Sequence, residues 1–379
     1  MKLLVDCRCF TRSIAGTATF LRLALDGFQK QTGCELWLLT PKEFKQGLPL
    51  HLDKNKTHLV FKELKVWGRR IPIPNILWYL IYVPIVAKKL QPDIFFTPSP
   101  SLPYFLPKKT KKLIIVHDMV HILYRDTMNF KNKLLNTLFT TRSINTADYI
   151  WTNSQYTKNG IIKYYPKRKQ KEIYVGDSDD TSLYRKINIS DKEIKDLKIK
   201  YGIKDKFLLF VGTLEPRKNL SFLLKVFSKL LESRHDVQLV IVGARGWKNS
   251  DISKIVMSDK GLHENAIFTG YVSNEDLVAI YNIADVLVST SLNEGLGLPQ
   301  LEAIFCGCPV VTAHNSAMIE TTEGRGVTVK GWDIDTWVKS INNVLNSDRA
   351  TFYEDKKDMH EYQWDNIIAG MVKYIQEHK

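Results

Sequence analysis

The stretch Asn293-Glu-Gly-Leu-Gly-Leu-Pro-Gln-Leu-Glu-Ala303 lies between two short apolar runs, Asp285–Ser289 and Pro309–Thr312. Apolar runs on either side of a glycine loop and a longer segment predict the order strand, loop, helix, turn, strand. Strands joined through a helix pair in parallel by a right-handed crossover. The stretch therefore predicts an α/β fold, with its glycine loop at the carboxyl end of a strand.

This loop has the composition of an anion-binding site. Gly295 and Gly297 allow a sharp turn and keep side chains away, so a ligand can approach the backbone amides. The amides lie at the start of a helix, where unpaired N–H groups and the helix dipole attract negative charge. The loop is therefore a candidate site for a phosphate-bearing ligand.

Two glutamates, Glu294 and Glu302, stand eight positions apart in the same stretch. At helical rise this spacing spans roughly 12 Å. An extended nucleotide sugar fits that reach if one carboxylate holds a sugar hydroxyl and the other a ribose hydroxyl. The alternative is a crossover helix with two solvated glutamates.

Strand and helix patterns alternate through both halves of the chain, which predicts parallel sheets. The expected first-half strands are Lys2–Asp6, Glu35–Thr40, Asp93–Thr97, Leu113–His117 and Tyr149–Thr152, and the helices are Thr19–Gln31, Asn75–Leu90, Lys131–Thr146 and Gln155–Tyr164. The second-half strands are Phe207–Val211, Gln238–Val242, Ala266–Phe268, Asp285–Ser289, Pro309–Thr312 and Gly326–Val329.

A polar, turn-forming segment that begins at Gly176 separates the halves. We expect two doubly wound, Rossmann-like α/β domains that face a central cleft: residues 1–180 and residues 181–355. Residues 356–379 should form a C-terminal helix that can pack back on the first domain. In such folds ligands bind beyond the carboxyl ends of the strands.

The 379 residues carry a net charge of +14, which attracts nucleic acids, anionic membranes or nucleotide-linked substrates. No recognisable nucleic-acid module accompanies the basic residues, so nucleic acid is not expected as a partner. The five cysteines lack the spacing of a zinc site. The N-terminus is not expected to be a secretory signal, because charge follows three apolar residues.

The longest apolar stretch, Ile71–Ala87, contains three prolines and is bracketed by Arg69-Arg70 and Lys88-Lys89. It is too short and too interrupted to predict a transmembrane helix. A buried helix is the first interpretation, and an interfacial segment with flanking cations is the second.

Three further positions could carry chemistry. In Phe207–Leu220 a strand and the turn at Gly212 precede Arg217 and Lys218, whose charges suit a diphosphate. Gly16 lies between the first strand and the first helix, where a phosphate-facing loop would sit. His117 ends a strand and could hydrogen-bond a substrate or transfer a proton. A plain turn at Gly16 and a structural role for His117 remain alternatives.

The chain resembles the retaining glycosyltransferases of the GT-B class, family 4 (glycosyl transferases group 1), and within them the mannosyl- and rhamnosyltransferase-like members. The motifs that carry this resemblance are Val5-Asp-Cys-Arg8, Val116-His-Asp-Met119, Thr146-Ala-Asp-Tyr-Ile-Trp-Thr-Asn-Ser154, Gly212-Thr-Leu-Glu-Pro-Arg-Lys-Asn219, Leu239-Val-Ile-Val-Gly243, Ala284-Asp-Val-Leu-Val-Ser289 and Asn293–Ala303. They run in family order across about 300 residues.

The resemblance implies a role for each matching position. Glu294, His117, Arg217 and Lys218 are the expected catalytic residues, and the expected donor-binding residues are Gly16, Gly212, Gly295, Leu296, Gly297, Leu298 and Glu302. Arg217 and Lys218 would neutralise the diphosphate, and Glu302 would bind the ribose hydroxyls.

The implied reaction moves a hexose from a GDP-, UDP- or dTDP-linked donor to a growing surface glycan or lipid-linked oligosaccharide. It would retain configuration and need no metal or other cofactor. We expect it in the cytoplasm, at the inner face of the cytoplasmic membrane. Two alternatives are a degenerate nucleotide-sugar-binding subunit and an epimerase or hydrolase on the same fold. The altered loop at 13–20, where Ala18 and Thr19 replace a glycine and an arginine of the family, leaves donor handling open.

Overall fold

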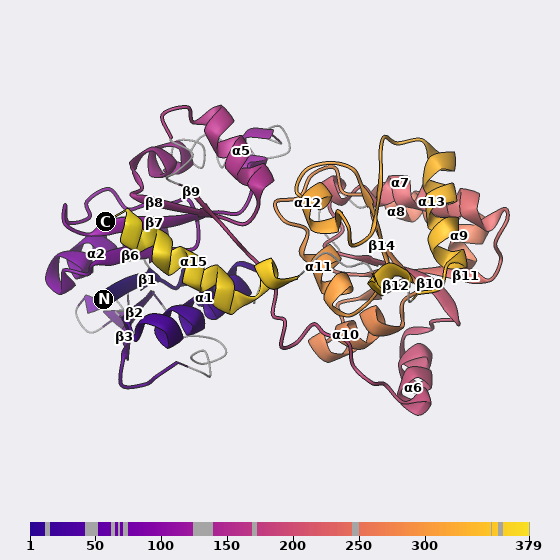
Figure 1. Cartoon of the computed structure of the whole chain (residues 1–379), viewed down its shortest axis with the longest axis horizontal. Helices are drawn as coiled ribbons and strands as arrows, with labels where there is room; N and C mark the ends of the chain where they lie inside the picture. Colours follow the sequence, from indigo (N-terminus) through magenta and orange to yellow (C-terminus); the bar gives the residue numbers. More distant parts are fainter. Residues whose placement is uncertain are drawn as a thin grey trace. The chain divides into compact units, whose positions relative to one another are not determined.

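The computed structural model describes residues 1–11, 16–41, 52–61, 65–66, 69–70, 75–123, 139–168, 173–244, 250–349, 351–354 and 359–378. The chain divides into two compact units (Figure 1). Unit 1 comprises Met1–Ser178 and His360–Lys379, and unit 2 comprises Asp179–Met359. Each unit is an α/β domain built on its own parallel sheet.

Unit 1 contains a seven-stranded sheet in the order β3-β2-β1-β6-β7-β8-β9, and each neighbouring pair is parallel. Its strands are β1 (Lys2–Asp6), β2 (Glu35–Thr40), β3 (Thr57–Phe61), β6 (Ile94–Thr97), β7 (Lys111–Val116), β8 (Tyr149–Thr152) and β9 (Ile173–Val175). A separate two-stranded ribbon joins β4 (Lys65–Val66) and β5 (Arg69–Arg70). The helical elements are η1 (Arg8–Thr11), α1 (Gly16–Thr32), α2 (Asn75–Leu90), α3 (Val120–Leu123), α5 (Gln155–Tyr164), η5 (His360–Tyr362) and α15 (Trp364–Glu377).

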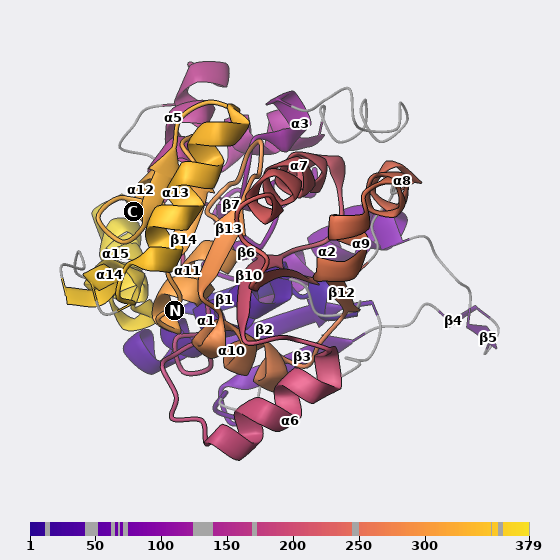
Figure 2. The ribbon, with the colours of Figure 1, turned by 90° about the vertical axis from the view of Figure 1, so that its right-hand side faces the viewer.

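Unit 2 contains a six-stranded parallel sheet in the order β12-β11-β10-β13-β14-β15 (Figure 2). Its strands are β10 (Lys206–Val211), β11 (Val237–Val242), β12 (Ala266–Gly270), β13 (Val286–Ser289), β14 (Val310–Ala313) and β15 (Val327–Val329). The helical elements are α6 (Asp191–Tyr201), η4 (Pro216–Lys218), α7 (Leu220–Leu231), α8 (Ser250–Ser258), α9 (Lys260–Asn265), α10 (Asn274–Ile283), α11 (Leu298–Phe305), α12 (Met318–Thr322), α13 (Ile334–Asn346) and α14 (Thr351–Glu354).

The two sheets confirm the predicted fold class, because every strand expected from an apolar run is present within one or two residues. The strands are buried on both faces, which is why they read as continuous apolar runs. Edge strands β3 and β9 were not expected. The first mixes polar and apolar residues, and the second has only three residues. Of the expected helix at 131–146, the described part, residues 139–146, is helical.

Two local expectations are wrong. The helix α11 begins at Leu298, so Glu294 lies in the preceding loop and a continuous helix does not set its distance from Glu302. The expectation of a buried helix at 71–87 is also wrong in part, because one face of α2 is exposed. Residues 71–74 lie outside the described part of the chain. Among the described residues, no helix has both the length and the apolarity to cross a bilayer.

The C-terminal helix α15 packs against α1 in the core of unit 1 (Figure 1). Its buried residues recur at helical spacing, namely Trp364, Ile367, Ile368, Met371, Tyr374 and Ile375. The fit is tight at Gly27 of α1, because a β-carbon there would lie 2.5 Å from Cγ1 of Ile368. The end of the chain is therefore part of the core of unit 1.

We expect Ile368→Ala to destabilise unit 1 by roughly 3 kcal/mol, because the side chain is fully buried and its removal leaves a cavity. Urea unfolding followed by tryptophan fluorescence measures the loss. Lys373→Ala on the exposed face of α15 is the control and should change stability by less than about 0.5 kcal/mol. Equal effects of the two substitutions would contradict this packing.

Candidate functional site

The strand order of unit 2 reverses at β10, since β11 lies on one side of it and β13 on the other. At such a point the segments that follow the two strands leave toward opposite faces of the sheet, and a ligand can enter between them. The segment after β10 contains Gly212 and η4. The segment after β13 is the loop 290–297, which ends at α11. The two sequence motifs with the strongest chemical signal thus meet at one position in the fold.

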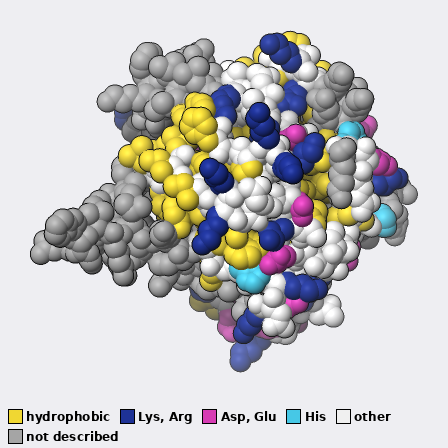
Figure 3. Space-filling view, turned by 90° about the vertical axis from the view of Figure 1, so that its left-hand side faces the viewer, with side chains coloured by type: hydrophobic (Ala, Val, Ile, Leu, Met, Phe, Trp, Pro, Cys, Tyr) yellow, Lys and Arg dark blue, Asp and Glu magenta, His cyan; other side chains and the backbone are white. Residues whose placement is uncertain are grey.

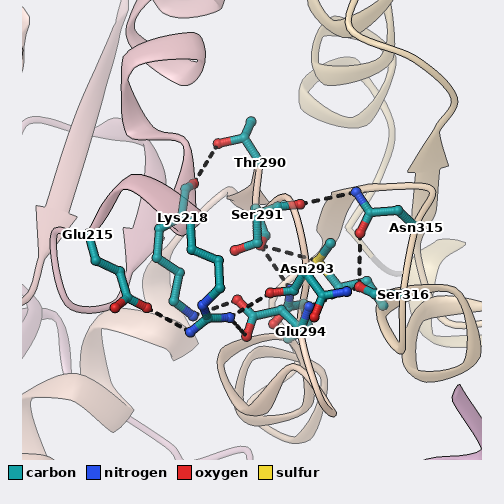
Figure 4. Close-up of polar contacts among 12 residues, drawn as sticks. Glu215, Lys218, Thr290, Ser291, Asn293, Glu294, Asn315 and Ser316 are labelled. Atoms are coloured by element: carbon teal, nitrogen blue, oxygen red, sulfur yellow. Dashed lines mark hydrogen bonds and ion pairs between the residues drawn. The ribbon is translucent and has the colours of Figure 1, made fainter. Parts of the chain in front are cut away.

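Hydrogen bonds to backbone carbonyls hold these two segments together. The amide of Leu292 donates to the carbonyl of Arg217 at 2.8 Å. The hydroxyl of Thr290 donates to the carbonyls of Lys218 and Asn219 at 3.2 and 3.1 Å (Figure 4). The turn between η4 and α7 depends on Asn219, whose backbone is in the left-handed region. This residue is the C-cap of η4 and the N-cap of α7. Arg217 and Lys218 consequently point toward the loop after β13.

Arg217 and Lys218 both form ion pairs with Glu294 (Figure 4). Nη1 of Arg217 lies 2.8 Å from Oε2 of this carboxylate, and Nζ of Lys218 lies 2.6 Å from its Oε1. The same guanidinium donates to the carbonyl of Asn293 at 2.5 Å and to Oε1 of Glu215 at 2.7 Å. The side chain of Glu294 is only 9% exposed, so these ion pairs are poorly screened by solvent. Two carboxylates and two cations form one neutral cluster.

The cluster determines the charge of Glu294. Burial by itself would raise the pKa of this carboxyl, but the neighbouring Lys218 and Arg217 outweigh burial and lower its pKa to about 2. Burial would likewise lower the pKa of Arg217, and its ion pair with Glu294 raises it above the ordinary value. Glu294 is therefore a carboxylate throughout the physiological pH range.

A third segment, after β14, fixes the backbone of the loop. The amide of Glu294 donates to Oγ of Ser316 at 3.0 Å, and Ser316 donates to Asn315 at 2.8 Å. The side-chain amide of Asn315 donates to the carbonyl of Ser291 at 3.1 Å (Figure 4). Sequence reasoning missed Asn315 and Ser316, because they belong to no motif. Glu215 lies within the motif Gly212–Asn219, but the sequence predicted no role for it.

The start of α11 presents the expected amides. Gly297 caps the helix with φ +94°, a conformation that side-chain-bearing residues rarely adopt. Among the described residues, none accepts a hydrogen bond from the amides of Leu296, Gly297 or Leu298. These N–H groups are therefore available to an anion.

Glu302 lies in a very different environment from Glu294. It is buried on α11, and its Oε2 accepts a hydrogen bond of 2.6 Å from the hydroxyl of the fully buried Tyr281. Burial raises the pKa of Glu302 well above its usual range, and the carboxylate of Asp179 raises it further. Asp179 comes from the polar segment that begins unit 2. Sequence reasoning found Glu302 but did not find Asp179 or Tyr281.

The remaining predicted site residues belong to unit 1. Gly16 is the exposed first residue of α1, and residues 12–15 before it lie outside the described part of the chain. His117 follows β7, where its Nε2 lies 3.2 Å from the carbonyl of Pro98 and its ring meets Phe20 edge to face. Because a carbonyl only accepts, Nε2 carries the proton and Nδ1 is left as an acceptor. Burial lowers the pKa of His117 despite the nearby Asp118, so its imidazole is neutral at pH 7.

Unit 1 also contains a buried ion pair at the carboxyl end of β1. Arg8 donates to both carboxylate oxygens of Asp6 at 2.9 and 2.8 Å, and its guanidinium lies 3.4 Å from the ring centroid of Tyr79. Thr97, at the end of β6, donates to the same carboxylate at 3.2 Å. The strand order of unit 1 reverses between β1 and β6, so this pair occupies the corresponding position of the first sheet.

The arrangement in unit 2 suits a ligand with a diphosphate and hydroxyl groups. Within the described ranges, no group of three side chains could hold a metal ion. Positive charge at this position comes from Arg217, Lys218 and the start of α11.

Residues 191–363 match the family model described as glycosyl transferases group 1. This part, a little under half of the chain, is similar to the glycosyl transferases of group 1. The expected resemblance is thereby confirmed for the part that contains the Glu294 cluster.

Curated proteins similar to this chain include mannosyltransferases of Escherichia coli. The serotype-specific mannosyltransferase WbdA is 26% identical over 327 residues, which make up 82% of this chain but 38% of WbdA. The O-antigen chain mannosyltransferase B is 29% identical over 283 residues, 71% of each chain. The chain thus spans about two fifths of WbdA and most of the second relative.

Solved structures share the fold of the whole chain. Sucrose-phosphate synthase from Thermosynechococcus elongatus superposes with a TM-score of 0.73 at 16% identity and covers 99% of this chain and 98% of its own. Anabaena HepE, solved in complex with UDP-glucose, gives 0.72 at 16% identity over the full length of both chains. The expected GT-B architecture of two parallel-sheet α/β domains is therefore confirmed.

The charge cluster predicts a pH-dependent stability. The pKa of Glu294 is lower in the folded state, about 2, than in an unfolded chain, so its contribution is present above pH 4.5 and is lost as pH falls toward 2. Between pH 6 and pH 3 the wild type should lose about 2 kcal/mol more than Glu294→Gln. Urea unfolding at each pH measures the difference between the proteins. Parallel losses in both would show that the ion pairs do not stabilise the fold.

Proposed function

We propose that this chain is a hexosyltransferase that moves a sugar from a nucleoside-diphosphate donor to a hydroxyl of a growing surface glycan. The single observation that carries the proposal is the buried cluster of Arg217, Lys218 and Glu294 beside the free amides of α11, within a glycosyl transferases group 1 domain. The mannosyltransferase relatives support a hexose, and HepE bound to UDP-glucose supports a nucleotide-sugar donor.

Sugar transfer requires positive charge near the departing nucleoside diphosphate. When the bond between the anomeric carbon and the phosphate oxygen breaks, the nucleoside diphosphate gains negative charge. Arg217 and Lys218 are poised to stabilise this charge, and so are the amides of Leu296 to Leu298. Since both cations are paired with Glu294 before the donor binds, the diphosphate must share or take over these contacts.

This exchange gives Glu294 a second role. As the diphosphate approaches the cations, the carboxylate becomes free to accept hydrogen bonds from hydroxyls of the transferred sugar. Glu302 is proposed to hold the ribose hydroxyls. Its raised pKa favours the protonated form, which donates a hydrogen bond to a diol as well as accepting one.

We further propose that the reaction needs no metal ion and retains the configuration of the sugar. Two side-chain cations and a helix terminus can replace a divalent ion at the diphosphate. Retention would follow from attack on the face that the phosphate leaves, with a phosphate oxygen taking the proton of the acceptor hydroxyl. His117, with neutral Nδ1, is the proposed contact of unit 1 to the substrates.

The acceptor is proposed to be a glycan or a lipid-linked oligosaccharide, handled by unit 1 at the cytoplasmic face of an anionic membrane. The O-antigen relative supports a surface glycan. Mannosyl or rhamnosyl transfer is the proposed specificity. No observation favours a degenerate subunit, an epimerase or a hydrolase.

The donor site is tested by thermal stabilisation with UDP, GDP and dTDP, each with and without EDTA. A ligand at 100 times its Kd should stabilise the protein by about 2.7 kcal/mol, and EDTA should not change the shift. Arg217→Ala and Lys218→Ala should reduce the shift, whereas Lys225→Ala on the exposed face of α7 should retain it. No shift with any nucleotide, or a shift that EDTA abolishes, would contradict the proposed site.

Transfer itself is tested with Glu294→Gln, using the donor identified by stabilisation and a radiolabelled sugar. We expect kcat to fall by roughly 10² to 10³, because an interaction that develops during transfer is lost. The affinity for the free nucleoside diphosphate should rise, because the cations lose their internal partner. Retained kcat in this variant would exclude Glu294 from the reaction.

A further inference from the structure

The helix α2 leaves one apolar face without a partner among the described residues. Trp78, Tyr79 and Val83 are buried beneath it, whereas Leu77, Ile81 and Ile85 are 47, 60 and 57% exposed. The exposed three recur every four residues, so they form a single stripe along the outer face. A stripe of large aliphatic side chains at this exposure is unusual on the surface of a soluble domain.

A neighbouring loop adds two exposed aromatic residues. The hydroxyl of Tyr79 donates to the carbonyl of Ser101, which holds the loop after β6 against α2. In that loop Tyr104 is 46% exposed and Phe105 is 79% exposed. Arg142 fixes the loop, since its guanidinium lies 4.1 Å from the Tyr104 ring centroid and donates to three loop carbonyls. The exposed rings are thus carried on an anchored segment.

The two segments that carry these residues contain basic residues and no acidic ones. Lys88 and Lys89 end α2, Lys108 and Lys109 end the loop, and all four are exposed. Residues 75–90 and 98–112 contain no aspartate or glutamate. Figure 3 views the side on which α2 lies in Figure 1, and it shows an apolar area bordered by Lys and Arg side chains. The apolar stripe therefore lies in a positive field.

We propose that this face of unit 1 docks on an anionic lipid bilayer. The membrane-docking surface consists of Leu77, Ile81, Ile85, Lys88, Lys89, Tyr104, Phe105, Lys108 and Lys109. The aliphatic and aromatic side chains enter the headgroup region while the lysines bind lipid phosphates. Because α2 does not have the length to span a bilayer, the contact is peripheral.

The charge selects this occupant over a second copy of the chain. A two-fold interface through the same face would oppose lysines with lysines, and like charges brought together destabilise the contact. A bilayer with anionic lipids neutralises the lysines and covers the apolar stripe at the same time. The inference rests on the proposed membrane location and names the surface that would make this contact, but it does not depend on the chemistry of sugar transfer.

The test is co-sedimentation of the full chain with vesicles, in the absence of donor and acceptor. One set of vesicles is pure phosphatidylcholine, and the other contains about one third phosphatidylglycerol. We expect binding only to the anionic vesicles. Lys88→Ala/Lys89→Ala should weaken it by roughly 30-fold, at about fivefold for each lost lysine. Ile81→Glu/Ile85→Glu should abolish it.

Matched controls lie on α6 of unit 2. Ile199 is 70% exposed, so Ile199→Glu places the same charge at an exposed aliphatic position outside the surface. Lys192→Ala/Lys195→Ala removes two exposed lysines there. Both controls should bind vesicles as the wild type does. Circular dichroism of each variant verifies that it is folded.

Three outcomes would overturn the proposal. These are absence of binding to anionic vesicles, equal losses in the α2 and α6 variants, and binding that survives Ile81→Glu/Ile85→Glu. A change from dimer to monomer in that variant, without any vesicle binding by the wild type, would assign the face to a protein interface instead. Because the assay uses no nucleotide, its failure leaves the donor-site experiment unaffected.

Discussion

The ion pairs of Glu294 with Arg217 and Lys218 are the constraint on which the candidate site depends. They join the loop after β13 to the turn after β10, two segments separated by more than seventy residues in sequence. Hydrogen bonds from the Thr290 hydroxyl and the Leu292 amide to carbonyls of the turn after β10 set the loops at the distance that these short contacts require. A buried charge group of this kind is costly unless each member has its partner, so loss of one residue affects the others. The geometry of the two loops therefore depends on all members of the cluster.

The surroundings shift the pKa values of the two glutamates of one motif in opposite directions. Two cations lower the pKa of Glu294 to about 2, whereas burial and Asp179 raise that of Glu302. Groups whose pKa values are pushed apart in this way usually have different roles at a site. This difference supports the proposed roles, in which Glu294 faces the transferred sugar and Glu302 faces a diol. Unit 1 has features of its own, namely a neutral His117, the Asp6–Arg8 ion pair and the exposed face of α2.

Much of the fold could be predicted because buried parallel strands have a strong pattern. The continuous apolar runs identified the central strands, and the glycine turns identified the carboxyl ends where Arg217 and Glu294 stand. The edge strands β3 and β9 were missed because only part of each is buried, which weakens the pattern. The face of α2 was misjudged for a related reason: Ile71–Ala87 is apolar on all sides, so periodicity could not show which residues are covered.

The sequence by itself determined the class of fold, the positions of the motifs and the residue types that can bind a sugar nucleotide. These depend on local pattern, since hydrophobic period and glycine positions act over a few residues. Only the tertiary structure decided the partners: Glu294 with two cations, Glu302 with Tyr281 and Asp179, and Asn315 with Ser291. Each of these contacts joins segments that chain spacing does not relate. Coulomb interaction and desolvation depend on distance in space, and folding alone sets that distance.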